Sequence, residues 1–103
     1  MSAAWTEADI PRLNPQRVAR IRDLLSAALA PLSLEVVDDS HKHAGHAGAR
    51  AGQGHFSVDI VSVAFAGRLP LARHRLVYAA LDEMMQADIH ALSIRARTPD
   101  EAD

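Results

Sequence analysis

The first half of the chain combines one helical and two extended patterns of apolar residues. Asn14 and Pro15 are typical of a helix start, since Asn caps the first turn and Pro needs no amide donor there. Six apolar residues follow at helical spacing before Pro31: Val18, Ile21, Leu24, Leu25, Ala28 and Leu29. Residues 34–38 and 56–61 have the short apolar pattern of strands. We therefore expect a helix followed by two strands.

The second half predicts a turn, a long helical region and a third strand. Gly67 centres the turn, and the helical region opens at Pro70 with a short first turn of its own. Its apolar face is expected to contain Leu71, His74, Val77, Tyr78, Leu81, Met84 and Met85. Residues 92–97 alternate again and would turn Ser93, Arg95 and Arg97 toward solvent. The expected fold is α+β, in the order αββααβ, with helices covering one face of a three-stranded sheet.

The same patterns divide the chain into one domain with two short tails. Residues 1–13 are expected to be an N-terminal tail, residues 14–99 the folded domain, and residues 100–103 a C-terminal tail. Ser40 to Gly54 is polar and rich in small residues, which indicates a long loop between the first two strands.

The amino-acid composition limits the kinds of ligand and partner that the chain can bind. The 103 residues include no cysteine and six histidines, and the net charge is −2. No disulfide or protein thiolate can form, so any iron–sulfur chemistry needs sulfur from a partner. Every basic residue except Lys42 is an arginine, and the net charge gives no overall attraction to nucleic acid. No apolar run is long enough to cross a membrane, and a cytoplasmic or organelle-matrix location is expected.

Three histidines lie close together in the predicted loop. His41, His43 and His46 form an H-x-H-x-x-H tract, and imidazole is a suitable ligand for zinc, copper, nickel or an iron–sulfur centre. A solvated polar loop with incidental histidines explains the spacing equally well. An Asp–His base pair with Asp38 or Asp39 is imaginable, but no nucleophile or phosphate motif accompanies it, so an enzyme is not expected.

Several short motifs, separated along the chain, occur in an order that can be compared with known families. They are Val37-Asp38-Asp39-Ser40, His55-Phe56, Ile60-Val61-Ser62, Phe65 to Arg75, Val77-Tyr78, Leu81, Ile89 to Arg97, and Thr98-Pro99. Together they resemble the BolA family over roughly residues 17–99. The resemblance implies a type II KH-like fold. It also implies binding to a monothiol glutaredoxin with a bridging 2Fe–2S cluster, and, as in some bacterial members, DNA binding.

The resemblance to histidine-type members of that family also implies a set of ligands. His90 matches the ligand at the start of the last strand, and His43 or His46 would supply the loop ligand. Glutaredoxin thiolate and glutathione would hold the other iron. A structural role for His90, with its ring bonded to a helix end or strand, is the alternative. His55 is expected to begin the second strand and help anchor the loop, and whether a free homodimer forms stays open.

The expected role is an adaptor in iron–sulfur trafficking. Its docking surface would combine the histidine loop, the start of the last strand, and a turn containing Gly67, Arg68, Arg73 and His74. The alternative is a DNA-binding regulator of stress or morphology genes that uses Arg73 and Arg75 near a helix start. Gly45-His46-Ala47-Gly48 matches the G-x-x-G of KH domains but lies between strands, so KH-type RNA binding is not expected.

Overall fold

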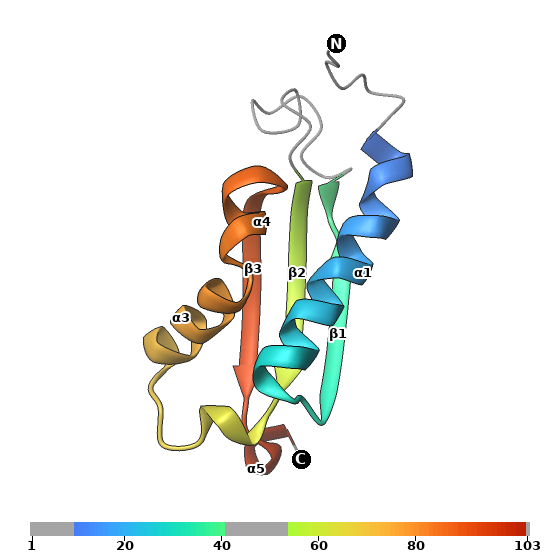
Figure 1. The fold of residues 1–103 in the computed structure, drawn as a ribbon. Helices are drawn as coiled ribbons and strands as arrows, with labels where there is room; N and C mark the ends of the chain where they lie inside the picture. The colour runs from blue at the N-terminus through green and yellow to red at the C-terminus, as the bar shows by residue number, and fades with distance from the viewer. Residues whose placement is uncertain (1–9, 41–53, 103) are drawn as a thin grey trace.

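The sheet contains three strands, β1 (Ser33–Asp38), β2 (Gly54–Val61) and β3 (Ile89–Arg97). In the computed structural model, which describes residues 10–40 and 54–102, β2 lies in the middle. It pairs antiparallel with β1 and parallel with β3. The helices α1 (Ile10–Leu29), α3 (Pro70–Ala80) and α4 (Asp82–Ala87) all lie on one face of the sheet (Figure 1). The predicted α+β fold and its element order are confirmed.

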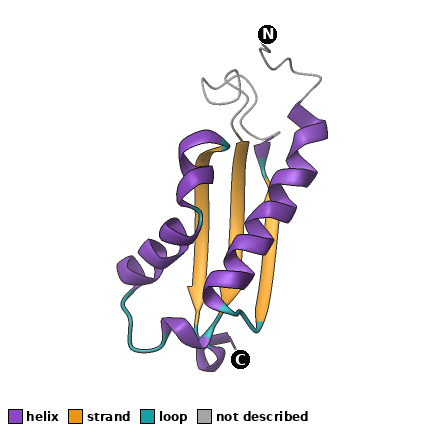
Figure 2. Cartoon of the chain, viewed as in Figure 1, coloured by secondary structure: helices purple, strands orange, loops and turns teal. Residues whose placement is uncertain are grey.

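The remaining elements close one end of the sheet. A 3₁₀ turn, η2 (Val63–Phe65), follows β2 directly, and the short helix α5 (Pro99–Ala102) follows β3 (Figure 2). Ser62 joins the end of β2 to the ends of β3 and α1, because its amide donates to the Arg97 carbonyl and its hydroxyl donates to the Leu29 carbonyl at 2.6 Å. No helix in the described part of the chain has the length and apolar character needed to cross a membrane.

The core lies between the helices and the inner face of β2. Phe56, Val58 and Ile60 alternate along β2 and are at most 2% exposed, as the period of a strand requires. The helices cover them mainly with the residues predicted from helical spacing: Ile21, Leu25, Leu29, Val77, Leu81 and Met84. Phe65 of η2 is completely buried in the same cluster. The binary pattern of the sequence therefore explains most of the core.

Two predicted boundaries are wrong. Helix α1 begins at Ile10, so Pro15 lies inside the helix and is not at its start. Pro11 satisfies the same first-turn rule, and the single hydrogen bond lost at Pro15 is tolerated close to a helix start. The C-terminal residues 100–102 belong to α5 and are not a tail. The Thr98 amide donates to the Glu101 carboxylate at 2.9 Å, which caps α5.

The helical region after Pro70 also differs from the prediction. It breaks at Leu81, where the backbone leaves the helical region (φ −106°, ψ 17°) and α4 begins. Leu71 and Tyr78, which were expected on the buried face, are 62% and 40% exposed. Apolar residues occur on several sides of α3, so spacing alone did not identify the side that faces the sheet.

Candidate functional site

The predicted site residues lie at two opposite ends of the sheet. Because β2 and β3 are parallel, Gly54 and Ile89 start at the same end, whereas η2 and Gly67 follow the other end of β2 (Figure 1). Eight residues of strand separate the two ends by about 25 Å. We call them the histidine end (His55 and His90) and the arginine end (Gly67, Arg68 and Arg73). The prediction that His90 and the Gly67 turn belong to one docking surface is therefore wrong.

The histidine end is held by bonds between four elements. Arg17 of α1 lies 3.4 Å from the Asp88 carboxylate, and the Asp88 carbonyl accepts from the Gly54 amide at 2.9 Å. Gly54 is required here, since a Cβ would lie 2.6 Å from the Phe56 ring and 2.9 Å from the Ser40 hydroxyl. The start of β3 is thus fixed against the start of β2.

The backbone of His55 is hydrogen-bonded to the two residues that follow β1. Its carbonyl accepts from the Asp39 amide at 2.8 Å, and its amide donates to the Ser40 hydroxyl at 3.1 Å. The side chain of Ser57, next along that face of β2, donates to the Asp39 carboxylate. These contacts agree with the predicted position of His55 at the start of the strand, and they bind it to Asp39 and Ser40.

His90 is exposed and lies beside His55. The β2–β3 ladder shifts register between Gly54 and His55, which pair with Ile89 and Ala91, so His90 is the extra residue. Such bulges re-aim a side chain, and here the two imidazole centroids are 5.0 Å apart with an interplanar angle of 48°. His55 itself is only 6% exposed. Sequence reasoning missed this pair, because it depends on a parallel pairing and a bulge that no local motif reveals.

The 5.0 Å between the ring centroids is typical of packed aromatic rings and is also compatible with two imidazoles on one metal ion. A metal–nitrogen distance of about 2.0–2.1 Å with tetrahedral angles places two coordinating imidazole centroids roughly 5 Å apart. No group of three or more His, Cys, Asp or Glu side chains in the described residues could hold a metal ion. A metal at this end would need further ligands from elsewhere.

His43 and His46 lie outside the described residues, as does the whole tract from His41 to Gln53. The residues that flank this segment are described. Ser40 and Gly54 both lie at the histidine end, where the Ser40 hydroxyl contacts the backbone of His55. The choice of His43 or His46 as the loop ligand stays a prediction.

The arginine end begins with a tight turn. Gly67 has a left-handed backbone (φ +73°), a conformation that glycine adopts without strain. The Arg68 amide donates to the Phe65 carbonyl at 3.1 Å, and the Arg68 side chain donates to the Ala64 carbonyl at 3.2 Å. The Arg68 guanidinium thus stays at the exposed surface of the turn.

Arg73 joins three parts of the fold. Its Nε donates to the Arg68 carbonyl at 2.7 Å, and its Nη1 donates to the Ala96 carbonyl of β3 at 3.2 Å. The two Nη atoms also bond both carboxylate oxygens of Glu101, at 2.5 and 3.1 Å. The side chain is only 12% exposed. Arg73 therefore fastens the turn and α5 to the sheet, and little of its guanidinium can reach a partner or DNA.

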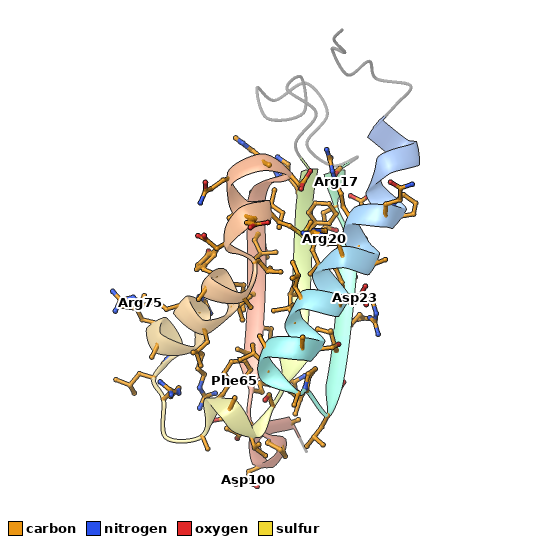
Figure 3. The ribbon with its side chains drawn as sticks, viewed as in Figure 1. Arg17, Arg20, Asp23, Phe65, Arg75 and Asp100 are labelled. Carbon is orange, nitrogen blue, oxygen red and sulfur yellow. The ribbon has the colours of Figure 1, made fainter. Side chains whose placement is uncertain are left out.

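The other predicted residues of this region have different surroundings. Arg75 is exposed and points away from the sheet (Figure 3). His74 is half-buried, and its ring forms no hydrogen bond with any described residue. Arg68 and Arg75 are thus the exposed cations near the start of α3.

The face of the sheet opposite the helices is open, as predicted. Ser93 and Arg95 of β3 are exposed there. Arg97 is partly buried, and its Nη2 donates to the Asp59 carboxylate at 2.9 Å, while Arg95 lies 3.8 Å from the same side chain. The charge of these arginines is therefore partly balanced within the chain.

The Arg73–Glu101 pair predicts a specific dependence of stability on pH. Hydrogen bonds from Arg73 and from the Thr98 amide lower the pKa of Glu101 from 4.5 to about 2, and Glu101 in turn raises the pKa of Arg73. The unfolded chain therefore takes up a proton on this carboxyl at higher pH than the folded chain. The stabilisation is complete above about pH 5 and is lost as the pH falls toward 2.

We expect Glu101→Gln to lower the free energy of unfolding at neutral pH, with a difference from the parent chain that shrinks as the pH falls from 5 to 3. Urea unfolding across this range measures it. Glu83→Gln is a suitable control, because Glu83 is 89% exposed and 3.9 Å from Arg20. A Glu101→Gln difference that does not change with pH would contradict the assignment.

Comparison with known proteins identifies the family. The family model described as BolA-like protein matches residues 25–101. This chain belongs to the BolA family. It is 44% identical to the chloroplastic protein BOLA1 of Arabidopsis thaliana, over 84% of this chain and 56% of that protein. It is 42% identical to the DNA-binding transcriptional regulator BolA of Escherichia coli, over 77% of this chain and 72% of the other.

A larger plant protein contains a similar BolA domain. SufE-like protein 1 of Arabidopsis thaliana, named as chloroplastic and mitochondrial, is 47% identical over 82% of this chain but only 24% of its own length. The chain thus spans less than two thirds of this relative and of plant BOLA1. The solved BolA domain of SufE1 matches with a TM-score of 0.74, 46% identity and coverage of 82% of this chain and 94% of that domain. BolA1 from the same plant gives 0.75, with 43% identity and coverage of 84% and 96%.

Proposed function

We propose that this BolA-like chain is an adaptor that binds a monothiol glutaredoxin and shares a bridging 2Fe–2S cluster with it. The observation that carries the proposal is the exposed His90, held on a bulge beside His55 with 5.0 Å between the ring centroids. The His90 ring forms no hydrogen bond with any described residue, whereas the structural alternative requires a bond to a helix end or strand. The proposal rests on imidazole ligands because the chain has no cysteine.

The chain's own residues would have distinct tasks. His90 offers its ring to an iron atom at the surface, while Arg17, Asp88 and Gly54 hold the start of β3 in place. The second imidazole would come from His55 or from a histidine of the adjoining segment, His43 or His46. When bound, a cluster with two imidazoles on one iron would supply one-electron chemistry at a higher potential than one with four thiolates.

The partner must supply the remaining ligands. A glutaredoxin thiolate and glutathione would complete the other iron, so the cluster would be bound only in the complex. The partner should therefore cover the histidine end. Gly67, Arg68, Arg73 and His74, predicted as partner-binding, lie toward the opposite end of the sheet, so in this proposal they would form a contact separate from the ligands.

Complex formation with and without cluster tests this function. We expect size-exclusion chromatography under anaerobic conditions to show a stable complex with a monothiol glutaredoxin when the cluster is reconstituted with glutathione. Iron and acid-labile sulfide should co-elute with both proteins. Reconstitution that leaves the two proteins in separate fractions, with the cluster on glutaredoxin alone, would refute the proposal.

A DNA-binding regulator is the second candidate. The similarity to a protein named DNA-binding transcriptional regulator, together with the exposed Arg68 and Arg75 near the start of α3, supports it. Arg73, the third arginine of the region, is bound to Glu101 and contributes less. Duplex DNA titrated at near-physiological salt should bind with sequence preference if this role holds, and weak, sequence-blind binding would argue against it.

The proposed roles place no catalytic step on the chain. The cytoplasmic location expected from the sequence also stays a prediction, because two of the similar plant proteins are named as organellar.

A further inference from the structure

An exposed stripe runs along the outer side of α3 and into α4. It consists of Leu71, Arg75, Tyr78, Asp82 and Gln86, and all five are exposed. Leu71, Arg75 and Tyr78 lie within a narrow arc of α3, and Asp82 and Gln86 follow at the same spacing in α4. We call these residues the outer stripe. It was predicted in part as core, yet Leu71 is 62% exposed and Tyr78 is 40% exposed.

The outer stripe faces away from the sheet. The opposite side of the same helices carries Val77, Leu81 and Met84, which are at most 1% exposed. Arg75 forms no ion pair with any described residue, and Asp82 has one contact, with the Gln86 amide at 3.5 Å. Figure 3 shows Arg75 directed away from the body of the molecule. The stripe therefore presents one cation, one anion and two large apolar groups to a partner.

The order of these residues makes the stripe complementary to itself. In an antiparallel pair of α3 helices related by a two-fold axis between Tyr78 and Ala79, Arg75 of each copy lies opposite Asp82 of the other. Tyr78 then packs over the small Ala79 of the other copy, and the arrangement is isologous, as a two-fold dimer requires. Two residues of the stripe, Asp82 and Gln86, lie beyond the break at Leu81, and Asp82 follows it directly, so the bend there does not prevent the ion pairing.

We propose that the outer stripe is the interface of a homodimer, in which Tyr78 lies at the two-fold axis between two Arg75–Asp82 ion pairs. A stable interface buries about 800 Å² of accessible surface on each partner, and a single pair of helices buries less. The dimer is therefore weak and forms at high protein concentration. The stripe contains neither His90 nor the other proposed ligands. The dimer is therefore independent of the proposed function.

Charge reversal on the full-length chain tests the interface. Arg75→Asp and Asp82→Arg each place like charges opposite one another in both pairs of the homodimer. We expect each variant alone to have an association constant lowered about tenfold or more in sedimentation equilibrium, because two attractive pairs become repulsive. A mixture of the two variants restores both pairs, so it should form a one-to-one heterodimer with the affinity of the parent chain.

The reversed double variant, Arg75→Asp with Asp82→Arg, should also recover self-association. Asp100→Arg is a control, since Asp100 is exposed on α5 and lies outside the stripe. Circular dichroism shows whether each variant remains folded. A parent chain that stays monomeric at millimolar concentration, or single variants that dimerise as well as the parent, would overturn the proposal. A mixture of the two variants that fails to associate would also overturn the proposal. The same holds if the stripe binds only a different protein.

Discussion

Replacing His90 by alanine should reduce the cluster retained by the glutaredoxin complex by tenfold or more. His90 is the exposed imidazole of the histidine end, and in the proposed complex its removal would leave the iron with one of the two imidazoles that this chain supplies. Even changes to residues that only support metal ligands commonly cost 10–100-fold in affinity. The measurement is the visible absorption and iron content of the complex isolated by size-exclusion chromatography.

His74→Ala is the matched control for this experiment. His74 is a half-buried histidine at the arginine end, and its loss should leave the cluster spectrum unchanged. Variants of His55, His43 and His46 then identify the second imidazole, because the one that supplies it should alter the spectrum as His90→Ala does. An intact spectrum in His90→Ala would remove this residue as a ligand.

The largest loss of stability is expected for Phe65→Ala. Phe65 is completely buried between the sheet and the helices, so its truncation removes core contacts and leaves a cavity. Large-to-small changes of this kind cost about 3–5 kcal/mol. Urea unfolding measures the difference in the free energy of unfolding.

Val63→Ala provides the comparison within the same 3₁₀ turn. Val63 is 66% exposed, and its truncation should change stability by no more than about 0.5 kcal/mol. A loss for Phe65→Ala as small as that for Val63→Ala would show that η2 does not belong to the core. The Gly67 turn would then lack the anchor described here.

The sequence was sufficient to predict the architecture because the strands and α1 have clear periodicity. Phe56, Val58 and Ile60 alternate with polar residues, and Ile21 and Leu25 recur at helical spacing, so the buried faces follow directly. The helices after Gly67 were harder, since Leu71 and Tyr78 satisfy the apolar pattern of α3 but face solvent. The outer face of these helices was identified only from their packing against the sheet.

The sequence identified His90 as a candidate ligand but could not show its surroundings. His90 was identified from a motif, yet its neighbour His55 became apparent only from the parallel pairing of β2 and β3 and the bulge between them. The same topology moves Gly67 to the opposite end of the sheet. Arg73 looked like a surface residue because sequence cannot show that Glu101, 28 residues later, returns to bond it.

The most direct test of the account is to identify the protein whose nitrogen binds the cluster. This chain is labelled with ¹⁵N-histidine, assembled with unlabelled glutaredoxin and glutathione, and reduced for pulsed electron paramagnetic resonance. We predict strong hyperfine coupling to ¹⁵N from this chain, and the coupling of one ring should disappear in His90→Ala. A cluster in the complex without any ¹⁵N coupling would show that its ligands come from glutaredoxin and glutathione alone, and would contradict the account.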